Sequence, residues 1–207
     1  FRECTGLTKV NIPSSVKWIW EDAFFDCSNL TDINIPNDIR VISRSSFGNT
    51  PWMNSQPDGL VYAGDCLLCY KGDAPTGVLN IKEGTRIIAN DAVSDSNISS
   101  VNIPNSVEII GTYAFSTCRE LSSIIIPKSV KHIDLGAFSN TGLTSMIVEE
   151  ENPVYDSREN CNAIIDTETN TLIAGCGKTF IPNSVTTIGD WAFYNCGKLY
   201  NLTIPNS

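Results

Sequence analysis

The chain has 207 residues, of which 42% are hydrophobic and 18% charged, and its formal net charge is -9 at pH 7. This negative charge argues against nucleic acid or an anionic membrane surface as a partner, because both bind proteins through clustered positive charge. The sequence has no run of 18 or more apolar residues, so no membrane-spanning helix is predicted.

One short pattern recurs along the chain. Residues 13–36, 104–127 and 183–207 each contain a Val, an Ile three residues later, an Ala-Phe pair, a Cys, and then apolar residues that lead to Ile-Pro. The Ile before Pro, or the residue equivalent to it, lies at positions 12, 35, 81, 103, 126, 148, 181 and 204. A repeat of about 20 to 29 residues is typical of a leucine-rich solenoid.

Residues 1–207 are therefore predicted to form one repeat array. The pattern is already running at Phe1 and is incomplete at Ser207, and neither end shows a polar capping repeat. We accordingly expect the array to be a fragment of a longer protein.

Each repeat predicts two short extended segments and a return. The first segment follows L-x-x-V-x-I, as in Leu7, Val10 and Ile12, and ends at Pro because Pro cannot donate to a strand ladder. The second is V-x-x-I, and the Ala-Phe pair begins a return that carries a stacked Phe. Wound as a right-handed, β-rich solenoid with short helical or irregular returns, the repeats predict one parallel β-sheet along one face.

Two segments break the period, at about residues 48–80 and 149–180. In the first, apolar runs flank Gly64-Asp65, a two-residue hairpin signal. In the second, apolar runs flank residues 167–170, which predicts a hairpin with Ile164 opposite Ile173 and Cys161 opposite Cys176. Both segments are predicted to be β-hairpins inserted into the array.

The unit AF-x-x-C-x-x-L-x-x-I-x-IP-x-S-V-x-x-IG resembles the BspA-like leucine-rich repeats of surface proteins from anaerobic bacteria and some parasitic protists. The resemblance extends over nearly the whole chain. It implies a leucine-rich repeat fold without a shared catalytic site, and an extracellular or cell-surface location. It also implies binding to host matrix proteins or to other cells, so a protein or glycan is the expected partner.

One row of side chains is predicted to point outward from the Ile-Pro strands. It consists of Asn11, Asn34, Asn80, Asn102, Ile125, Ile147, Phe180 and Thr203. The Asn residues are expected to hydrogen-bond along the stack. The large apolar residues either form an exposed interaction site or lie under the second hairpin.

A second outward row follows the Val of each V-x-x-I segment. Its basic members are Lys17, Arg40, Arg86 and Lys131, with Glu108 and Thr186 at equivalent positions. The row is either simply solvated or a contact for an acidic partner segment or a sulfated glycan.

The eight Cys residues fall into three groups. Four share one repeat position and are predicted to be buried free thiols: Cys4, Cys27, Cys118 and Cys196. Cys66 and Cys69 have C-x-x-C spacing but no second pair or helix start, which argues against a zinc or redox site. Cys161 and Cys176 are a candidate disulfide, because facing hairpin positions bring Cβ atoms close together.

No constellation of catalytic residues is apparent. His132, the sole His, lies in a V-x-x-I segment and is interpreted as a surface residue, and Glu149–Glu151 lack the spacing of a calcium loop. No metal or cofactor is expected. The sequence favours a non-enzymatic binding module related to adhesion; the alternative is a spacer that holds other domains away from the cell surface.

Overall fold

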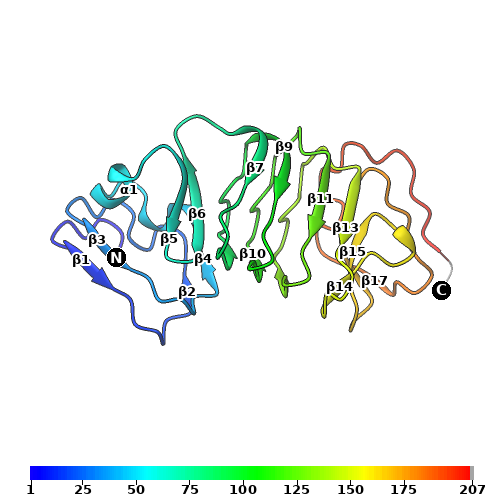
Figure 1. Cartoon of the computed structure of the whole chain (residues 1–207), viewed down its shortest axis with the longest axis horizontal. Coiled ribbons are helices and arrows are strands. Elements are labelled where there is room, and N and C mark those ends of the chain that lie inside the picture. Colours follow the sequence, from blue (N-terminus) through cyan, green and yellow to red (C-terminus); the bar gives the residue numbers. More distant parts are fainter. Residues whose placement is uncertain (206–207) are drawn as a thin grey trace.

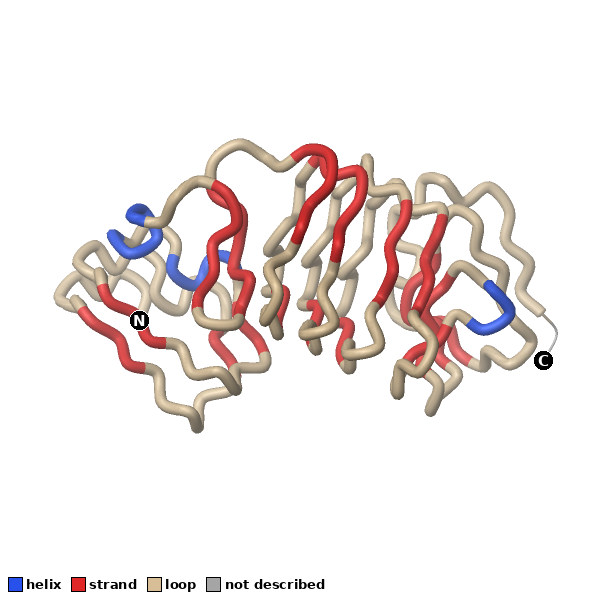
Figure 2. Tube along the Cα trace, in the orientation of Figure 1, coloured by secondary structure: helices blue, strands red, loops and turns tan. Residues whose placement is uncertain are grey.

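The computed structural model describes residues 1–205 as an elongated solenoid, with the chain advancing along its long axis from one end to the other (Figure 1). Each coil has two extended sides and a return side. Strands occupy the extended sides, and most of the remaining chain is loop (Figure 2). Within this described part, no helix is both long and apolar enough to cross a membrane.

The Ile-Pro segments form the first row of strands. These strands are β1 (Lys9–Asn11), β3 (Asp32–Asn34), β7 (Thr76–Asn80), β9 (Asn97–Asn102), β11 (Ser123–Ile126) and β13 (Ser145–Val148). They pair in parallel as β1-β3, β7-β9 and β11-β13. Because β9 also contacts β11, four first-row strands follow one another along the stack, as the period predicts.

The V-x-x-I segments form the second row and contain the longest continuous sheet. These strands are β2 (Trp18–Ile19), β4 (Val41–Ile42), β8 (Ile87–Ile88), β10 (Ile109–Ile110), β12 (His132–Ile133) and β17 (Thr187–Ile188). The order β12-β10-β8-β6-β5 joins three of them to the first hairpin. Within the five-stranded sheet, the two-residue strands β8 and β10 each pair with a neighbour on both sides.

The return segments are also hydrogen-bonded from coil to coil. Most returns have two residues with positive φ: one precedes the Ala-Phe pair, such as Asp22 (φ 55), and one lies two positions after the Phe, such as Asp26 (φ 58). The Asp26 amide donates to Gly48 O at 3.0 Å, and the Phe24 amide donates to Ser46 O at 2.8 Å. The left-handed residues thus turn amides along the stack axis, where the next coil accepts them.

The Phe residues of the returns form the predicted stacked spine in the core. The Phe24 ring stacks on Phe1 at 5.2 Å and on Phe47 at 5.4 Å between centroids, and Phe115 stacks on Phe138 at 6.0 Å. Buried Val93 occupies the same repeat position between the two stacks. Two short return-side helices, η1 (Arg44–Phe47) and α1 (Pro51–Ser55), lie near the N-terminal stack.

The first insert is the predicted hairpin. Its strands, β5 (Gly59–Ala63) and β6 (Cys66–Lys71), are antiparallel, and Ala63 pairs with Cys66 across Gly64-Asp65. The start of β6 then pairs in parallel with β8. The hairpin is therefore part of the second row and does not hang from it.

The second insert is also a hairpin, but the predicted register is wrong. It contains β14 (Tyr155–Asp156), η2 (Arg158–Asn160), β15 (Ala163–Asp166) and β16 (Thr171–Gly175). Ile164 pairs with Ala174, and Ile165 with Leu172, because a register shift lies between Ile164 and Ile165. Simple counting from the turn omits this irregularity. As in the first insert, the last strand joins the second row, where β16 pairs in parallel with β17.

Candidate binding surface

The first half of the outward row is a hydrogen-bonded Asn ladder. Asn34 Nδ2 donates to Asn11 Oδ1 at 2.8 Å, and Asn102 Nδ2 donates to Asn80 Oδ1 at 2.6 Å. All four side chains are exposed, and the predicted amide bonding is confirmed within each of these two pairs. Each pair spans two coils that are also paired through their backbones, which holds the amides in register.

The apolar stripe, defined as Ile125, Ile147 and Phe180, is open to solvent. The three residues are 54%, 48% and 44% exposed. Ile125 and Ile147 face each other directly in the β11-β13 pairing, whereas the alternate residues Ile124 and Met146 point into the core. The second hairpin therefore leaves these three side chains uncovered.

Polar residues flank the stripe. A surface hollow of about 440 Å³ is lined by Ile147 together with Glu149–Glu151, Tyr155, Asp156 and Arg158. The Arg158 guanidinium donates to Asp156 at 2.9 Å and to Asn170 Oδ1 at 2.8 Å, which holds it in place. Thr203, the last member of the row, is exposed and lies outside any strand. An apolar patch with a polar rim is typical of an interaction surface.

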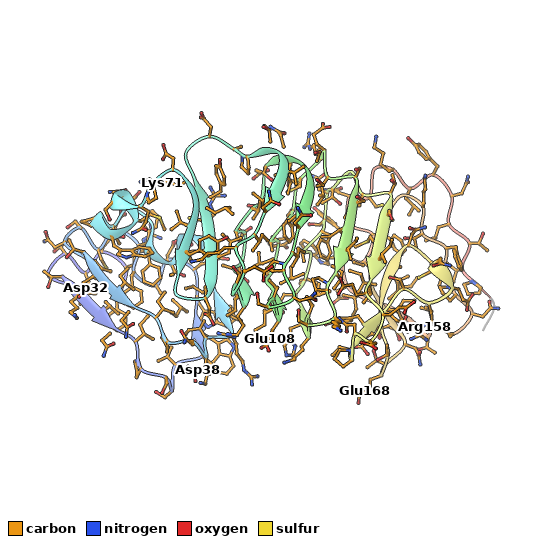
Figure 3. The ribbon with its side chains drawn as sticks, viewed as in Figure 1. Asp32, Asp38, Lys71, Glu108, Arg158 and Glu168 are labelled. Carbon is orange, nitrogen blue, oxygen red and sulfur yellow. The ribbon has the colours of Figure 1, made fainter. Side chains whose placement is uncertain are left out.

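Most of the basic row is neutralised by carboxylates of the stack. Lys17 contacts Asp38, Arg86 Nε lies 2.8 Å from Asp65, and Lys131 Nζ lies 2.8 Å from Glu108. Arg40 is exposed, and no ion pair joins it to another of residues 1–205. Figure 3 shows Asp38 and Glu108 along the same edge of the stack as β4 and β10. The basic row thus forms ion pairs within the solenoid. Little unpaired positive charge is left for an acidic partner.

The shared-position Cys residues are free thiols. Cys27 and Cys118 are buried, but Cys4 is exposed and Cys196 only partly covered, since fewer coils pack over them. Cys66 and Cys69 are also buried free thiols, and burial raises the pKa of both.

Cys161 and Cys176 are free thiols in the structure. The shifted register of β15 and β16 removes the facing position on which their pairing was predicted. The Cys176 thiol instead donates to Asn162 O at 3.2 Å, and Cys161 Sγ lies 3.8 Å from Ala163 O. Burial raises the pKa of both thiols.

His132 and the acidic triplet have the surface placements expected of them. His132 is exposed on β12. Glu149 Oε2 accepts the Lys128 amide at 3.1 Å, and Glu151 pairs with the Lys128 side chain at 3.3 Å, so both fix the neighbouring coil. Among residues 1–205, no group of three His, Cys, Asp or Glu residues is arranged to hold a metal ion.

A further concave site lies on the return side and was not predicted. This return-side pocket, a cavity of about 250 Å³, lies between residues 133–141 and 189–196, with Ile173, Ala174 and Gly175 of β16 in its lining. Trp191 and Tyr194 contribute aromatic rings, and Asp134 and Asp190 contribute carboxylates. At the repeat position two residues before each spine residue, the sequence has Tyr113 and Trp191 where other coils have Asp, Ser or Gly. That contrast was the available sequence signal.

Stacked parallel strands, a buried Phe spine and outward rows define a leucine-rich repeat solenoid. Its sequence matches a model of the BspA type leucine rich repeat region, in six copies, over residues 1–56, 75–164 and 174–207. The chain belongs to this family. The unmatched residues, 57–74 and 165–173, fall within the two hairpin inserts.

Solved structures share the same fold. The chain is similar to a leucine rich cell surface protein from Faecalibacterium prausnitzii, with 24% identity, a TM-score of 0.55, and coverage of 95% of this chain and 54% of that one. It is also similar to the pneumococcal vaccine antigen PcpA, with 19% identity, a TM-score of 0.53, and coverage of 96% and 51%. This chain thus spans about half the length of either protein. No curated protein matches it.

Proposed function

We propose that this chain is a non-enzymatic, protein-binding repeat module of a bacterial surface or secreted protein, with a role in adhesion. The observation that carries the proposal is the exposed apolar stripe of Ile125, Ile147 and Phe180. Two of its residues lie side by side on strands that are paired over four residues, so the stripe is preorganised. A partner segment that binds it loses little freedom in the module itself.

The size of the stripe suits a contact of moderate strength. Burying one exposed Ile or Phe side chain fully contributes about 1.5–3 kcal/mol, so the three half-exposed side chains together contribute roughly 2–4 kcal/mol. Removing two of them is therefore expected to weaken binding by at least about tenfold, since about 1.4 kcal/mol corresponds to a factor of ten.

The test compares the native chain with the double variant Ile125→Ser/Ile147→Ser. Both are measured against immobilised fibronectin, laminin and collagen by biolayer interferometry, together with thermal unfolding. The expected result is a large loss of affinity at an unchanged melting temperature. The matched control is Val78→Ser, because Val78 is 58% exposed on a first-row strand but lies outside the stripe.

A spacer function is the second candidate, and the tied surface of the N-terminal coils favours it. The Asn amides bond to one another, and Lys17 pairs with Asp38, so these coils present few unsatisfied groups to a ligand. If the native chain bound none of the three matrix proteins, the spacer would be preferred. If the double variant lost stability along with binding, Ile125 and Ile147 would be structural residues.

A further inference from the structure

Trp191 in the lining of the return-side pocket, and Tyr113 in contact with its ring, have a costly backbone conformation. Trp191 has φ 62 and Tyr113 has φ 55, whereas the equivalent positions in other coils hold Asp22, Asp91 and Gly136. A residue with a bulky side chain loses about 1–2 kcal/mol in the left-handed region. Strain of this kind tends to persist where a side chain has a function.

The aromatic rings are held together but remain accessible. The Trp191 ring centroid lies 4.6 Å from that of Tyr194 and 5.5 Å from that of Tyr113. Gly136 makes the arrangement possible, because a Cβ there would lie 2.5 Å from the Tyr113 ring. Trp191 is 43% exposed and Tyr194 is 50% exposed, so part of this aromatic surface faces solvent next to the cavity.

Asp134 gives the pocket an open hydrogen-bond acceptor. Its side chain is half-buried, and burial raises its pKa although the nearby His132 opposes the shift. Among residues 1–205, no group donates a hydrogen bond to its carboxylate. Two hydroxyl groups of the lining are already used within the fold: Ser139 Oγ donates to Ser116 Oγ at 3.1 Å and Thr141 Oγ1 donates to Phe138 O at 2.9 Å. A partly desolvated carboxylate without a donor is suited to accept hydroxyl groups from a ligand.

We propose that the return-side pocket binds one neutral hexose unit of an oligosaccharide. The C–H face of the sugar packs against Trp191, because the electron-rich face of an aromatic ring attracts the polarised C–H groups of a partner. A sugar hydroxyl donates to Asp134. This inference goes beyond the proposed function, since none of the pocket residues belongs to the apolar stripe.

Size and charge select this class of ligand. Pockets for drug-sized molecules measure about 300–1,000 Å³, so a cavity of about 250 Å³ suits a single ring with the rest of the glycan outside. The carboxylates of Asp134 and Asp190, on a chain with net charge -9, repel sialic and uronic acids.

The test uses saturation-transfer NMR on the full chain. The probes are the methyl glycosides of glucose, galactose and mannose, with cellobiose and lactose, and N-acetylneuraminic acid is the charged comparison. At least one neutral probe is expected to receive saturation from aromatic protons and to quench Trp fluorescence, whereas N-acetylneuraminic acid is not expected to bind.

The decisive variant is Trp191→Asn. Asn tolerates positive φ, so this variant is expected to keep its melting temperature or to raise it, while it loses the sugar signal. Asp134→Asn is expected to weaken sugar affinity about tenfold. The control Trp20→Asn removes an exposed Trp outside the pocket and should bind sugar normally.

Two outcomes overturn the proposal: no neutral probe binds at millimolar concentration, or the signal survives in Trp191→Asn. Neither outcome bears on the apolar stripe, whose variants Ile125→Ser/Ile147→Ser keep the pocket intact. Failure of the sugar site is thus distinguishable from failure of the proposed function.

Discussion

Single residues with positive φ set the course of every return. In most coils the position two residues after the spine residue is Asp or Asn, as in Asp26, Asn49, Asp95 and Asn140, and Thr117 departs from this pattern. Asn and Asp tolerate the left-handed region better than other residues with side chains, and a β-branched residue fits it poorly. Thr117, with φ 63, therefore carries a cost that its equivalents avoid.

Replacing Thr117 with Asn is expected to stabilise the chain by about 1 kcal/mol, because it relieves this cost. Chemical denaturation measures the change in the free energy of unfolding. The reciprocal variant Asn140→Thr, one coil further on, should destabilise by a similar amount. If Thr117→Asn and the native chain were equally stable, the positive φ of Thr117 would carry no local free-energy cost, and contacts with the neighbouring coils would compensate for it.

Asp134 is expected to make stability depend on pH. Burial raises its folded-state pKa above the usual 3.8, so the folded chain holds this proton more tightly than the unfolded chain. Its contribution to stability is then greatest below pH 3.8 and falls as pH rises through the raised pKa. Asp134→Asn should therefore be more stable than the native chain at neutral pH, with the advantage disappearing in acid.

Denaturation curves recorded across the acidic range test this expectation. The control is Asp190→Asn, which removes an exposed carboxylate from the same pocket and so measures the effect of losing one charge there. A native profile that keeps its shape in Asp134→Asn would contradict the assignment to this carboxyl.

At the scale of elements, each hairpin insert continues the solenoid with its second strand. In the first insert, Cys66, Leu67 and Leu68 of β6 are fully buried, and the turn before them contains Gly64 with φ 63. Space around Gly64 is open, since an added Cβ would lie 3.8 Å from its nearest neighbours. Any cost of a side chain there comes from the backbone conformation.

Gly64→Ala is accordingly expected to reduce the free energy of unfolding by about 1–2 kcal/mol. Gly6→Ala is the matched control, because its φ is ordinary and no atom lies within 4 Å of the added Cβ. Thermal and denaturant unfolding of both variants give the comparison. Equal effects at the two sites would indicate that the turn adopts another conformation.

The repeat period made these elements predictable, and its interruptions limited the prediction. The Asn ladder and the Gly64-Asp65 turn follow from spacing alone. The register shift between Ile164 and Ile165 could not be predicted by counting residues from the turn, because it depends on how β15 packs against the array. The ion pairs of Lys17 with Asp38 and of Arg86 with Asp65 join residues at different positions of the repeat, so aligning the repeats did not reveal them. The return-side pocket was missed because the second insert separates its two coils in sequence.

At the scale of the whole molecule, each coil is stabilised by its contacts with the neighbouring coils. A solenoid behaves approximately as a one-dimensional chain of units with nearest-neighbour contacts. Val93 separates the stack of Phe1, Phe24 and Phe47 from that of Phe115 and Phe138. We expect the two halves to respond separately to core damage.

Phe115→Ala should destabilise by about 3–5 kcal/mol, as is usual for a buried Phe. In this variant, hydrogen exchange should show loss of protection in β9 to β13 before β1 and β3. Only the former strands lie near the space that the missing Phe115 ring leaves in the core. Phe24→Ala should reverse this order. A uniform loss of protection in both variants would show that the array unfolds as a single cooperative unit.

The turn between β15 and β16 offers a practical opening for protein engineering. Thr167, Glu168 and Thr169 are exposed, and Asp166 Oδ1 accepts the amides of Glu168 at 3.1 Å and Thr169 at 2.8 Å. Since β16 is anchored on β17, foreign loops grafted at this tip would be displayed on a rigid rod, and recognition sequences could be exchanged there as cassettes.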